Sequence, residues 1–134
     1  MRCSGLFYSA VLLGSIFQLA SGTCNARLRR QTAEIALPLS DLCAGPELDG
    51  SSFTITCSIG PGFSIPSIDL NSCLNNDDGV LGFSHGSAFL TCSGCELQDL
   101  RLTCNCQTIE HGPVSTMIDL NEGVFLRPDG QLAC

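Results

Sequence analysis

The sequence predicts an all-β fold of short antiparallel strands and hairpins, stapled by disulfides, and three observations support this prediction. The tetrapeptide Ile-Asp-Leu-Asn occurs at residues 68–71 and again at 118–121. The chain of 134 residues contains 10 cysteines, a density typical of small domains held by disulfides. Short runs of alternating apolar and polar residues are separated by Gly, Asp and Asn, as strands are separated by turns.

The repeated tetrapeptide is one landmark of a tandem duplication. Each copy runs on to an Asp-Gly pair followed two residues later by leucine, at 78–81 and at 129–132. Each is preceded by a cysteine frame of the form C-x4-L-x4-[LF]-x3-C, which begins at Cys43 and at Cys92. Landmarks that agree in kind, order and spacing indicate a duplicated structural unit. We expect repeat one at about residues 40–90 and repeat two at about 91–134.

The doubled pattern of cysteine frame, [SM]-I-D-L-N and D-G-x-L resembles the cyanovirin-N homology (CVNH) family, in the form of a fungal-type secreted member. The resemblance covers roughly residues 40–134. It implies a pseudo-symmetric tandem-repeat fold in which the two repeats exchange strands. It also implies a lectin that binds neutral, mannose-type sugars without catalysis or cofactor. A monomer and a domain-swapped dimer are both compatible with it.

The first 22 residues are expected to be a secretory signal peptide. Arg2 precedes an apolar run from Leu6 to Leu19, and the small residues Ala20 and Gly22 occupy the −3 and −1 positions of a cleavage site. The run is shorter than the roughly 20 apolar residues that a membrane-spanning helix needs. We therefore expect a secreted, extracellular protein without a membrane anchor.

A second cleavage is indicated by the dibasic pair Arg29 and Arg30, which makes residues 23–30 a possible propeptide. The alternative is an exposed basic linker. Loss of the signal peptide removes Cys3, and cleavage after Arg30 would also remove Cys24. An even number of cysteines would then remain, able to close four disulfides in an oxidising compartment.

Hairpin spacing suggests how those cysteines pair. Cys43 with Cys57, and Cys92 with Cys106, would each clip the two antiparallel strands of a hairpin. Cross-strand neighbours within one hairpin have a nearly constant sum of position numbers. The same rule nests a further pair inside the second hairpin. The pairs are completed by that nested bond and by one assigned by elimination: Cys95 with Cys104, and Cys73 with Cys134.

The nested pair requires an irregular strand. Residues 92 and 95 lie on opposite faces of a regular strand, whereas 104 and 106 lie on the same face. We therefore expect a β-bulge near Gly94 that restores the parity.

Alternation predicts the strands of repeat one. Residues 33–41, which include Pro38, support no more than a leader or a short turn. Phe53 to Cys57 alternates apolar and polar residues after an Asp49-Gly50 turn, as the second strand of a hairpin does. Residues 60–66 are expected to form a loop because Gly and Pro dominate them.

Two short strands complete the repeat. Residues 67–71 are expected to form a strand that directs Ile68 and Leu70 to one side and its polar residues to the other. Residues 75–79 are expected to form a polar turn, and residues 80–83 are expected to form the next strand. No stretch predicts a helix of useful length.

Charge narrows the range of partners. The chain has 13 acidic residues against six arginines and no lysine, a net charge of −7, and four of the arginines lie at or before Arg30. Such a surface repels phosphate groups, so nucleic acid is disfavoured as a partner. Neutral oligosaccharides or glycoproteins are compatible with it.

Two patterns invite other interpretations. Residues 82–86 match the G-x-S-x-G elbow of serine hydrolases, and Asp99 and His111 follow in the order of a triad. The elbow needs a buried parallel strand before the serine and a helix after it, whereas this segment leads directly into a cysteine hairpin. The cysteines between 92 and 106 could instead bind zinc, but oxidised pairs are expected in a secreted chain.

Carboxylates in turns could also suggest a glycosidase, and eight cysteines could suggest a hydrophobin. Asp is common in turns for structural reasons, and hydrophobins contain adjacent Cys-Cys doublets that are absent from this sequence. His85 and His111 lack metal-ligand spacing. We expect no catalytic residue, metal or cofactor. The carboxylates that could suggest a glycosidase belong to the turn residues Asp77, Asp78, Glu110 and Glu122.

The family resemblance implies two carbohydrate sites. Glycan hydroxyls both donate and accept hydrogen bonds, so such sites need mixed polar groups at fixed positions. The first site is expected to retain more of its polar set, because Gly60-Pro61 replaces polar residues in the second. A module of the same fold without sugar binding is the alternative. Position by position, the first site comprises Asn75, Asn76, Asp78, Ser87, Thr91 and Gln107, and the second comprises Ser58, Gly60, Arg127 and Asp129.

Overall fold

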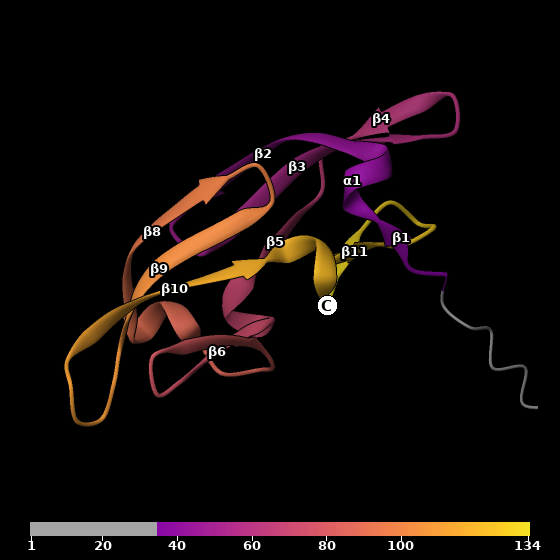
Figure 1. Ribbon diagram of the computed structural model, residues 1–134. Coiled ribbons are helices and arrows are strands. Elements are labelled where there is room, and N and C mark those ends of the chain that lie inside the picture. Colours follow the sequence, from indigo (N-terminus) through magenta and orange to yellow (C-terminus); the bar gives the residue numbers. More distant parts are fainter. Residues whose placement is uncertain (1–34) are drawn as a thin grey trace, which may run out of the picture. The chain divides into compact units, whose positions relative to one another are not determined.

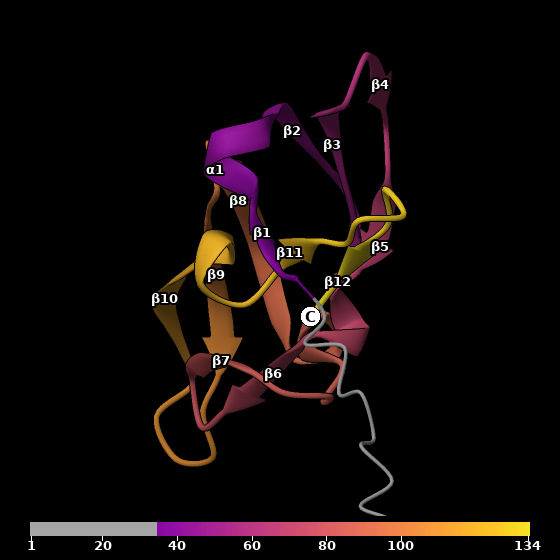
Figure 2. The same cartoon turned by 90° about the vertical axis from the view of Figure 1, so that its right-hand side faces the viewer.

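Short antiparallel strands make up most of the structure, a computed structural model that describes residues 35–134 (Figures 1 and 2). The expected signal peptide and propeptide lie outside the described residues. Within residues 35–134 no helix is long and apolar enough to cross a membrane. The all-β, disulfide-stapled fold class is confirmed.

The first cysteine hairpin consists of β2 (Cys43–Asp49) and β3 (Ser52–Ile59). The alternation of β3 buries Phe53, Ile55 and Cys57, each no more than 1% exposed. Two further strands, β4 (Gly62–Ser64) and β5 (Ser67–Asp69), pair with the two ends of β3. The expectation of a loop over residues 60–66 is therefore wrong at β4.

The turn that begins β4 explains this error. Ile59 pairs with Gly62, so Gly60 and Pro61 form a two-residue hairpin loop, with Gly60 at a φ of 57°. Glycine is favoured at the first position of such a loop because a positive φ there matches the strand twist. The two residues that suggested a loop by composition therefore connect two paired strands.

Repeat two contains the corresponding hairpin, β8 (Cys92–Gln98) and β9 (Arg101–Gln107), with β10 (Pro113–Asp119) on the other edge of β9. The pairing register of β8 and β9 shifts between Ser93 and Glu96, which confirms the bulge expected near Gly94. Repeat one has the same shift, between Ala44 and Glu47, although no nested disulfide requires it there. The bulge is therefore a property of the hairpin.

The structure contains the four disulfides expected from the sequence. Three join neighbouring strands, with Cα–Cα distances of 4.0 to 4.1 Å, and the fourth spans 61 residues. All four cysteines of the alternative zinc site are oxidised in these bonds. The pairs are Cys43–Cys57, Cys92–Cys106, Cys95–Cys104 and Cys73–Cys134.

The second hairpin of each repeat packs against the other repeat. In repeat one this hairpin is β6 (Leu74–Asp77) with β7 (Val80–Phe83), and β7 lies against β10 of repeat two. The turn expected over residues 75–79 is therefore too long, because pairing of Asp77 with Val80 leaves only Asp78 and Gly79 between the strands. In repeat two the second hairpin is β11 (Phe125–Leu126) with β12 (Leu132–Ala133). β12 lies beside β5, and β11 pairs with β1 (Leu37–Pro38) (Figure 2). The repeats therefore exchange strands.

The duplicated tetrapeptide ends a strand and begins a short 3₁₀ helix in both repeats. These helices are η1 (Leu70–Ser72) and η3 (Leu120–Glu122). In repeat one the strand ends at Asp69, two residues earlier than expected, because the Asp69 carboxylate accepts a hydrogen bond from the Asn71 backbone N–H at 3.0 Å. This bond, with one from the Ser51 hydroxyl, lowers the pKa of Asp69 below its ordinary value.

The asparagine of each tetrapeptide accepts a hydrogen bond from the short helix that leads into the cysteine hairpin of the other repeat. The Asn71 side-chain oxygen accepts a hydrogen bond from the Phe89 backbone N–H in η2 (Ala88–Leu90), at 3.1 Å. The Asn121 oxygen accepts one from the Ser40 N–H in α1 (Leu39–Leu42), also at 3.1 Å. Since η2 leads into β8 and α1 leads into β2, each asparagine stabilises the entry to the neighbouring hairpin.

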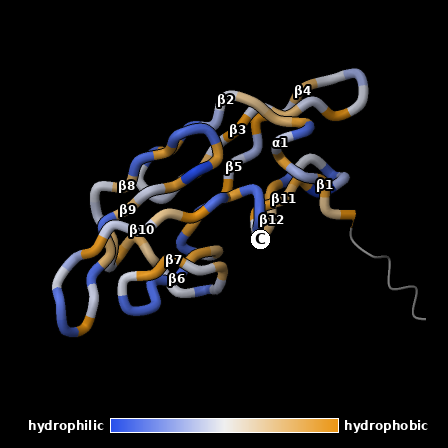
Figure 3. The backbone as a smooth tube through the Cα atoms, in the orientation of Figure 1, coloured by the Kyte–Doolittle hydropathy of each residue, from blue (hydrophilic) through white to orange (hydrophobic). Residues whose placement is uncertain are grey.

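A single buried cluster fills the space between the two repeats. Leu70 and Leu120 of the tetrapeptides are both 0% exposed, as are Phe53 and Leu102 of the two central strands. Figure 3 shows hydrophobic and hydrophilic residues alternating over short distances along the backbone, as short half-buried strands require.

Candidate functional site

The first candidate region is assembled around the side-chain amide of Asn76 in β6. Its Nδ2 donates to the Thr91 hydroxyl at 3.0 Å and to the Gln107 carbonyl at 2.9 Å. Its Oδ1 accepts from the Gly79 backbone N–H at 2.7 Å. Three of the expected residues, Asn76, Thr91 and Gln107, are therefore brought together. Both amide protons of Asn76 are used within the protein, so this side chain holds the region in place.

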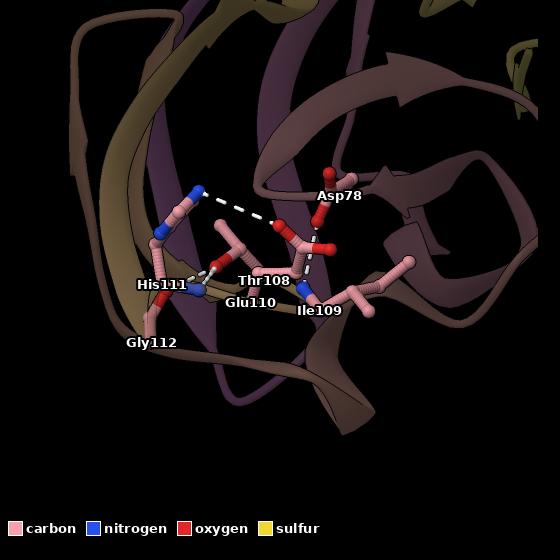
Figure 4. Close-up of polar contacts among 6 residues, drawn as sticks. All are labelled: Asp78, Thr108, Ile109, Glu110, His111 and Gly112. Atoms are coloured by element: carbon pink, nitrogen blue, oxygen red, sulfur yellow. Dashed lines mark hydrogen bonds and ion pairs between the residues drawn. The ribbon is translucent and has the colours of Figure 1, made fainter.

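The turn between β6 and β7 is tied to the loop between β9 and β10. Asp78, at a φ of 49°, accepts a hydrogen bond from the Ile109 backbone N–H at 2.7 Å (Figure 4). Within that loop the Thr108 hydroxyl donates to the Gly112 carbonyl at 2.8 Å and accepts from the His111 N–H at 2.9 Å. One oxygen of Asp78 is thus committed to the backbone of repeat two.

Gly79 is required where these two segments meet. Its φ is 89°, and a Cβ placed there would lie 2.5 Å from the Val114 side chain and 2.6 Å from that of Thr108. Only glycine combines this backbone conformation with so close an approach. The Asp-Gly pair of the sequence motif therefore closes the turn and allows it to dock on the other repeat.

Asn75 and Ser87, the remaining expected residues of this region, keep free side-chain polar groups, and so does Gln107. The side chains of Asn75, Ser87 and Gln107 make no hydrogen bond to another residue in the described part of the chain. Asn75 lies close to Gly86, where an added Cβ would approach the Asn75 Cβ to 2.3 Å. These three groups and the second Asp78 oxygen are available to a ligand.

Exposed aliphatic side chains surround those polar groups. Ile109 is 87% exposed, Leu90 is 82% exposed and Val80 is 62% exposed. Leu90 precedes Thr91, and Ile109 follows the Gln107–Thr108 segment, so both border the Asn76 hydrogen bonds. The first region is therefore more apolar than the expected residues alone suggested.

The scaffold role of Asn76 predicts a stability effect. Asn76→Ala removes three hydrogen bonds and should lower the free energy of unfolding by about 2 kcal/mol. Urea denaturation followed by circular dichroism measures this change. Asn75→Ala is the matched control, and it should change the free energy by less than about 0.5 kcal/mol. Equal effects of the two substitutions would contradict the assignment.

The second candidate region lies where the β11–β12 turn approaches the β3–β4 hairpin. Gly130 in that turn has a φ of 84°, and an added Cβ would lie 3.0 Å from Ile59 Cδ1. Arg127 and Asp129 form an ion pair in the same turn at 3.8 Å. The position of Gly130 against repeat one mirrors that of Gly79 against repeat two, so the fold presents two related regions.

A groove of about 290 Å³ lies beside β2, β3 and β4, and its described lining includes no residue of the β11–β12 turn. Of the four residues expected here, only Ser58 lines it. Gly60 forms the adjacent hairpin turn, while Arg127 and Asp129 belong to the β11–β12 turn. The other lining residues were not predicted: Asp41, Leu42, Cys43, Ala44, Thr56 and Phe63.

Phe63 gives this groove its distinctive chemistry. It lies in β4 opposite Ser58, and it is 79% exposed. A large aromatic side chain left this exposed beside hydroxyl and carboxylate groups forms a surface with both apolar and hydrogen-bonding character. The incorrect expectation of a loop over residues 60–66 concealed it, because strand pairing fixes its position next to Ser58.

The G-x-S-x-G segment does not form a nucleophile elbow. The strand before Ser84 is β7, which pairs antiparallel with β6, and the segment after it leads through Ser87 to the 3₁₀ helix η2. The elbow geometry needs a parallel strand and a following α-helix. This pattern match therefore has no structural counterpart.

Comparison with known proteins identifies the same architecture elsewhere. The sequence profile of the CVNH domain matches residues 40–133. A MoCVNH3 variant, in a complex with (N-GlcNAc)4, has 19% sequence identity and a TM-score of 0.65, over 70% of this chain and 94% of that chain. Microvirin, in a complex with mannobiose, has 23% identity and a TM-score of 0.61, over 70% of this chain and 95% of that chain.

A third similar structure is GzCVNH of Gibberella zeae. It has 20% identity and a TM-score of 0.61, over 71% of this chain and 94% of that chain. At these identities the three structures share the fold, and the match to the domain profile covers both repeats and all the candidate residues.

Proposed function

Because the chain belongs to the CVNH domain family, we propose that it is a lectin that binds neutral, mannose-type oligosaccharides or glycoproteins and catalyses no reaction. Two structurally similar proteins are in complexes with saccharides, the MoCVNH3 variant with (N-GlcNAc)4 and microvirin with mannobiose. These complexes support carbohydrate as the class of ligand. The family resemblance identified in the sequence suggests mannose-type sugars within that class.

The groove beside β4 is the observation on which this proposal depends. A sugar ring has hydroxyl groups at its edge and apolar C–H bonds on its face. Ser58, Thr56 and Asp41 offer hydrogen-bonding groups for the edge, and the exposed Phe63 ring offers an apolar surface for the face. Three strands and a disulfide hold these groups in place, so little ordering is needed on binding.

The first region is a second site in this proposal. Asn75, Asp78, Ser87 and Gln107 supply its ligand groups, while Asn76 and Thr91 hold the scaffold. A branched oligosaccharide that reached both regions would bind more tightly than one confined to a single region.

A nuclear magnetic resonance titration tests the function. We expect millimolar mannobiose to shift the backbone amide resonances of Ser58 and Phe63 in the purified protein. The N-acetylglucosamine tetramer serves as the second probe. The absence of any shift with either sugar at millimolar concentration would rule out the lectin.

Phe63→Ala should weaken sugar binding at the β4 groove by about tenfold or more, since covering an aromatic side chain contributes roughly 1.5–3 kcal/mol. The substitution removes an exposed side chain, so the thermal midpoint should hardly change. Ile65→Ala is the matched control, because Ile65 is 69% exposed in the same segment but does not line the groove. Isothermal titration calorimetry compares the variants, and equal affinities would remove Phe63 from the site.

Secretion is part of the proposal. Four disulfides in residues 35–134 support folding in an oxidising compartment, as the signal-peptide pattern suggests. N-terminal sequencing of the protein recovered from culture medium tests it. A first residue of Gln31 would support cleavage after Arg30, and a first residue of Thr23 would support signal cleavage alone.

The exposed aliphatic side chains of the first region favour a second candidate function. Ile109, Leu90 and Val80 would suit contact with a protein partner, so that the same fold would act as a secreted interaction module without sugar binding. Copurification of a protein partner in the absence of glycan, with no response to sugar in the titration, would favour this alternative.

A further inference from the structure

A polar groove lies outside both candidate regions, at the turn between β8 and β9. Its volume is about 510 Å³, within the range of roughly 300–1,000 Å³ that is usual for small-molecule sites. Among the described residues that line it, Leu100 alone is apolar. The polar lining residues are Ser40, Gln98, Asp99, Arg101, Asp119 and Asn121.

Hydrogen bonds hold together the three segments that line this groove. The Ser40 backbone N–H at the start of α1 donates to Asn121 Oδ1 at 3.1 Å. The Leu120 N–H donates to the Leu100 carbonyl at 2.8 Å, which ties η3 to the β8–β9 turn. The groove is therefore formed before any ligand binds, and its occupation needs little ordering of the chain.

Most of its polar groups have no partner among the described residues. Among residues 35–134, the Gln98 amide, the Asp99 carboxylate and the Arg101 guanidinium form no hydrogen bond or ion pair with another described residue. Asp119 uses one carboxylate oxygen to accept from the Asn121 N–H at 3.0 Å and keeps the other. The groove thus presents donors and acceptors side by side.

The chemistry of these groups selects the class of ligand. Two carboxylates, on Asp99 and Asp119, outweigh the single guanidinium of Arg101, so an anionic ligand is disfavoured. An apolar ligand would find only Leu100 to cover it. The hydroxyl groups of a neutral molecule can accept hydrogen bonds from the Arg101 guanidinium and donate hydrogen bonds to the two carboxylates. We propose that this groove is a separate binding site for a neutral saccharide.

Repeat one provides an internal comparison. Its hairpin turn has the same register, and Gly50 and Ser52 occupy the positions of Asp99 and Arg101. Gly50 has a φ of 60° and Asp99 has a φ of 54°. A left-handed conformation suits glycine better than aspartate. Repeat two therefore carries a carboxylate and a guanidinium at turn positions where repeat one has glycine and serine.

The double variant Asp99→Gly, Arg101→Ser tests the proposal by giving repeat two the turn residues of repeat one. The variant should fold at least as well as the wild type, because the left-handed position receives glycine. Saccharide binding at the groove should weaken by about tenfold or more, since two charged hydrogen-bonding groups are lost. Titrations with mannobiose, the N-acetylglucosamine tetramer and a glucuronic acid oligosaccharide, followed by nuclear magnetic resonance, measure this.

The expected result is a shift of the Gln98, Arg101 and Asn121 backbone amides with at least one neutral probe, and its loss at Gln98 and Asn121 in the double variant. No shift at these residues with either neutral probe would overturn the proposal, as would stronger binding of the glucuronic acid oligosaccharide. The Phe63 amide reports separately on the β4 groove. Phe63→Ala should leave the shifts at Gln98 unchanged, so failure of one site is distinguishable from failure of the other.

Discussion

Leu120→Ala should lower the free energy of unfolding of the whole protein by about 3–5 kcal/mol, and Leu70→Ala should do the same. Both side chains are 0% exposed, and they occupy equivalent positions in the two copies of the tetrapeptide. Each substitution would leave a cavity in the buried cluster to which both repeats contribute side chains. Replacement of either leucine by alanine should therefore destabilise both repeats.

The number of unfolding transitions distinguishes shared from independent repeats. Urea unfolding monitored by circular dichroism should show one cooperative transition for the wild type and for each variant. Leu90→Ala is the control, because Leu90 is 82% exposed and its loss should cost less than about 0.5 kcal/mol. Two separate transitions, with only one displaced by each core substitution, would show that the repeats fold independently.

The second large effect is expected from the disulfide between Cys73 and Cys134. It closes a loop of 61 residues, and the chain-entropy relation assigns about 4 kcal/mol to a loop of that length. The Cys95–Cys104 bond spans nine residues, for which the same relation gives about 2.6 kcal/mol. Replacing both cysteines of each pair with alanine should therefore destabilise the protein more in the first case.

Thermal unfolding of the two double-alanine variants measures this difference. The Cys73–Cys134 bond joins the end of η1 in repeat one to the last residue of the chain, beside β12 of repeat two. A smaller loss of stability from this pair than from Cys95–Cys104 would mean that strand exchange holds the chain end without the covalent link.

The local elements were predictable because their signals lie close together in the sequence. Cysteine spacing indicated the hairpin pairs, and the parity of residues 92 and 95 indicated the bulge at Gly94. The exchange of the second hairpins was not derivable from the residues, since alternation in residues 80–83 shows that a strand forms but not which sheet it joins. The family resemblance alone implied it.

The candidate site was predicted less completely. The residues implied for the first region are brought together at Asn76, yet the sequence could not reveal that its amide is used up by Thr91 and Gln107. Phe63 was missed because composition favoured a loop where pairing forms β4. The groove at Arg101 was missed because its lining comes from three segments distant in sequence.

Strand exchange also has a consequence for fragments of this protein. A peptide that ended between β7 and η2 would carry a hairpin whose packing partner, β10, lies on the other fragment, and the reverse holds for β11 and β12. Neither piece could cover its own apolar face, whereas a mixture of the two could rebuild the shared core without a peptide bond between them. Complementation of this kind would mean that neither repeat folds without the other.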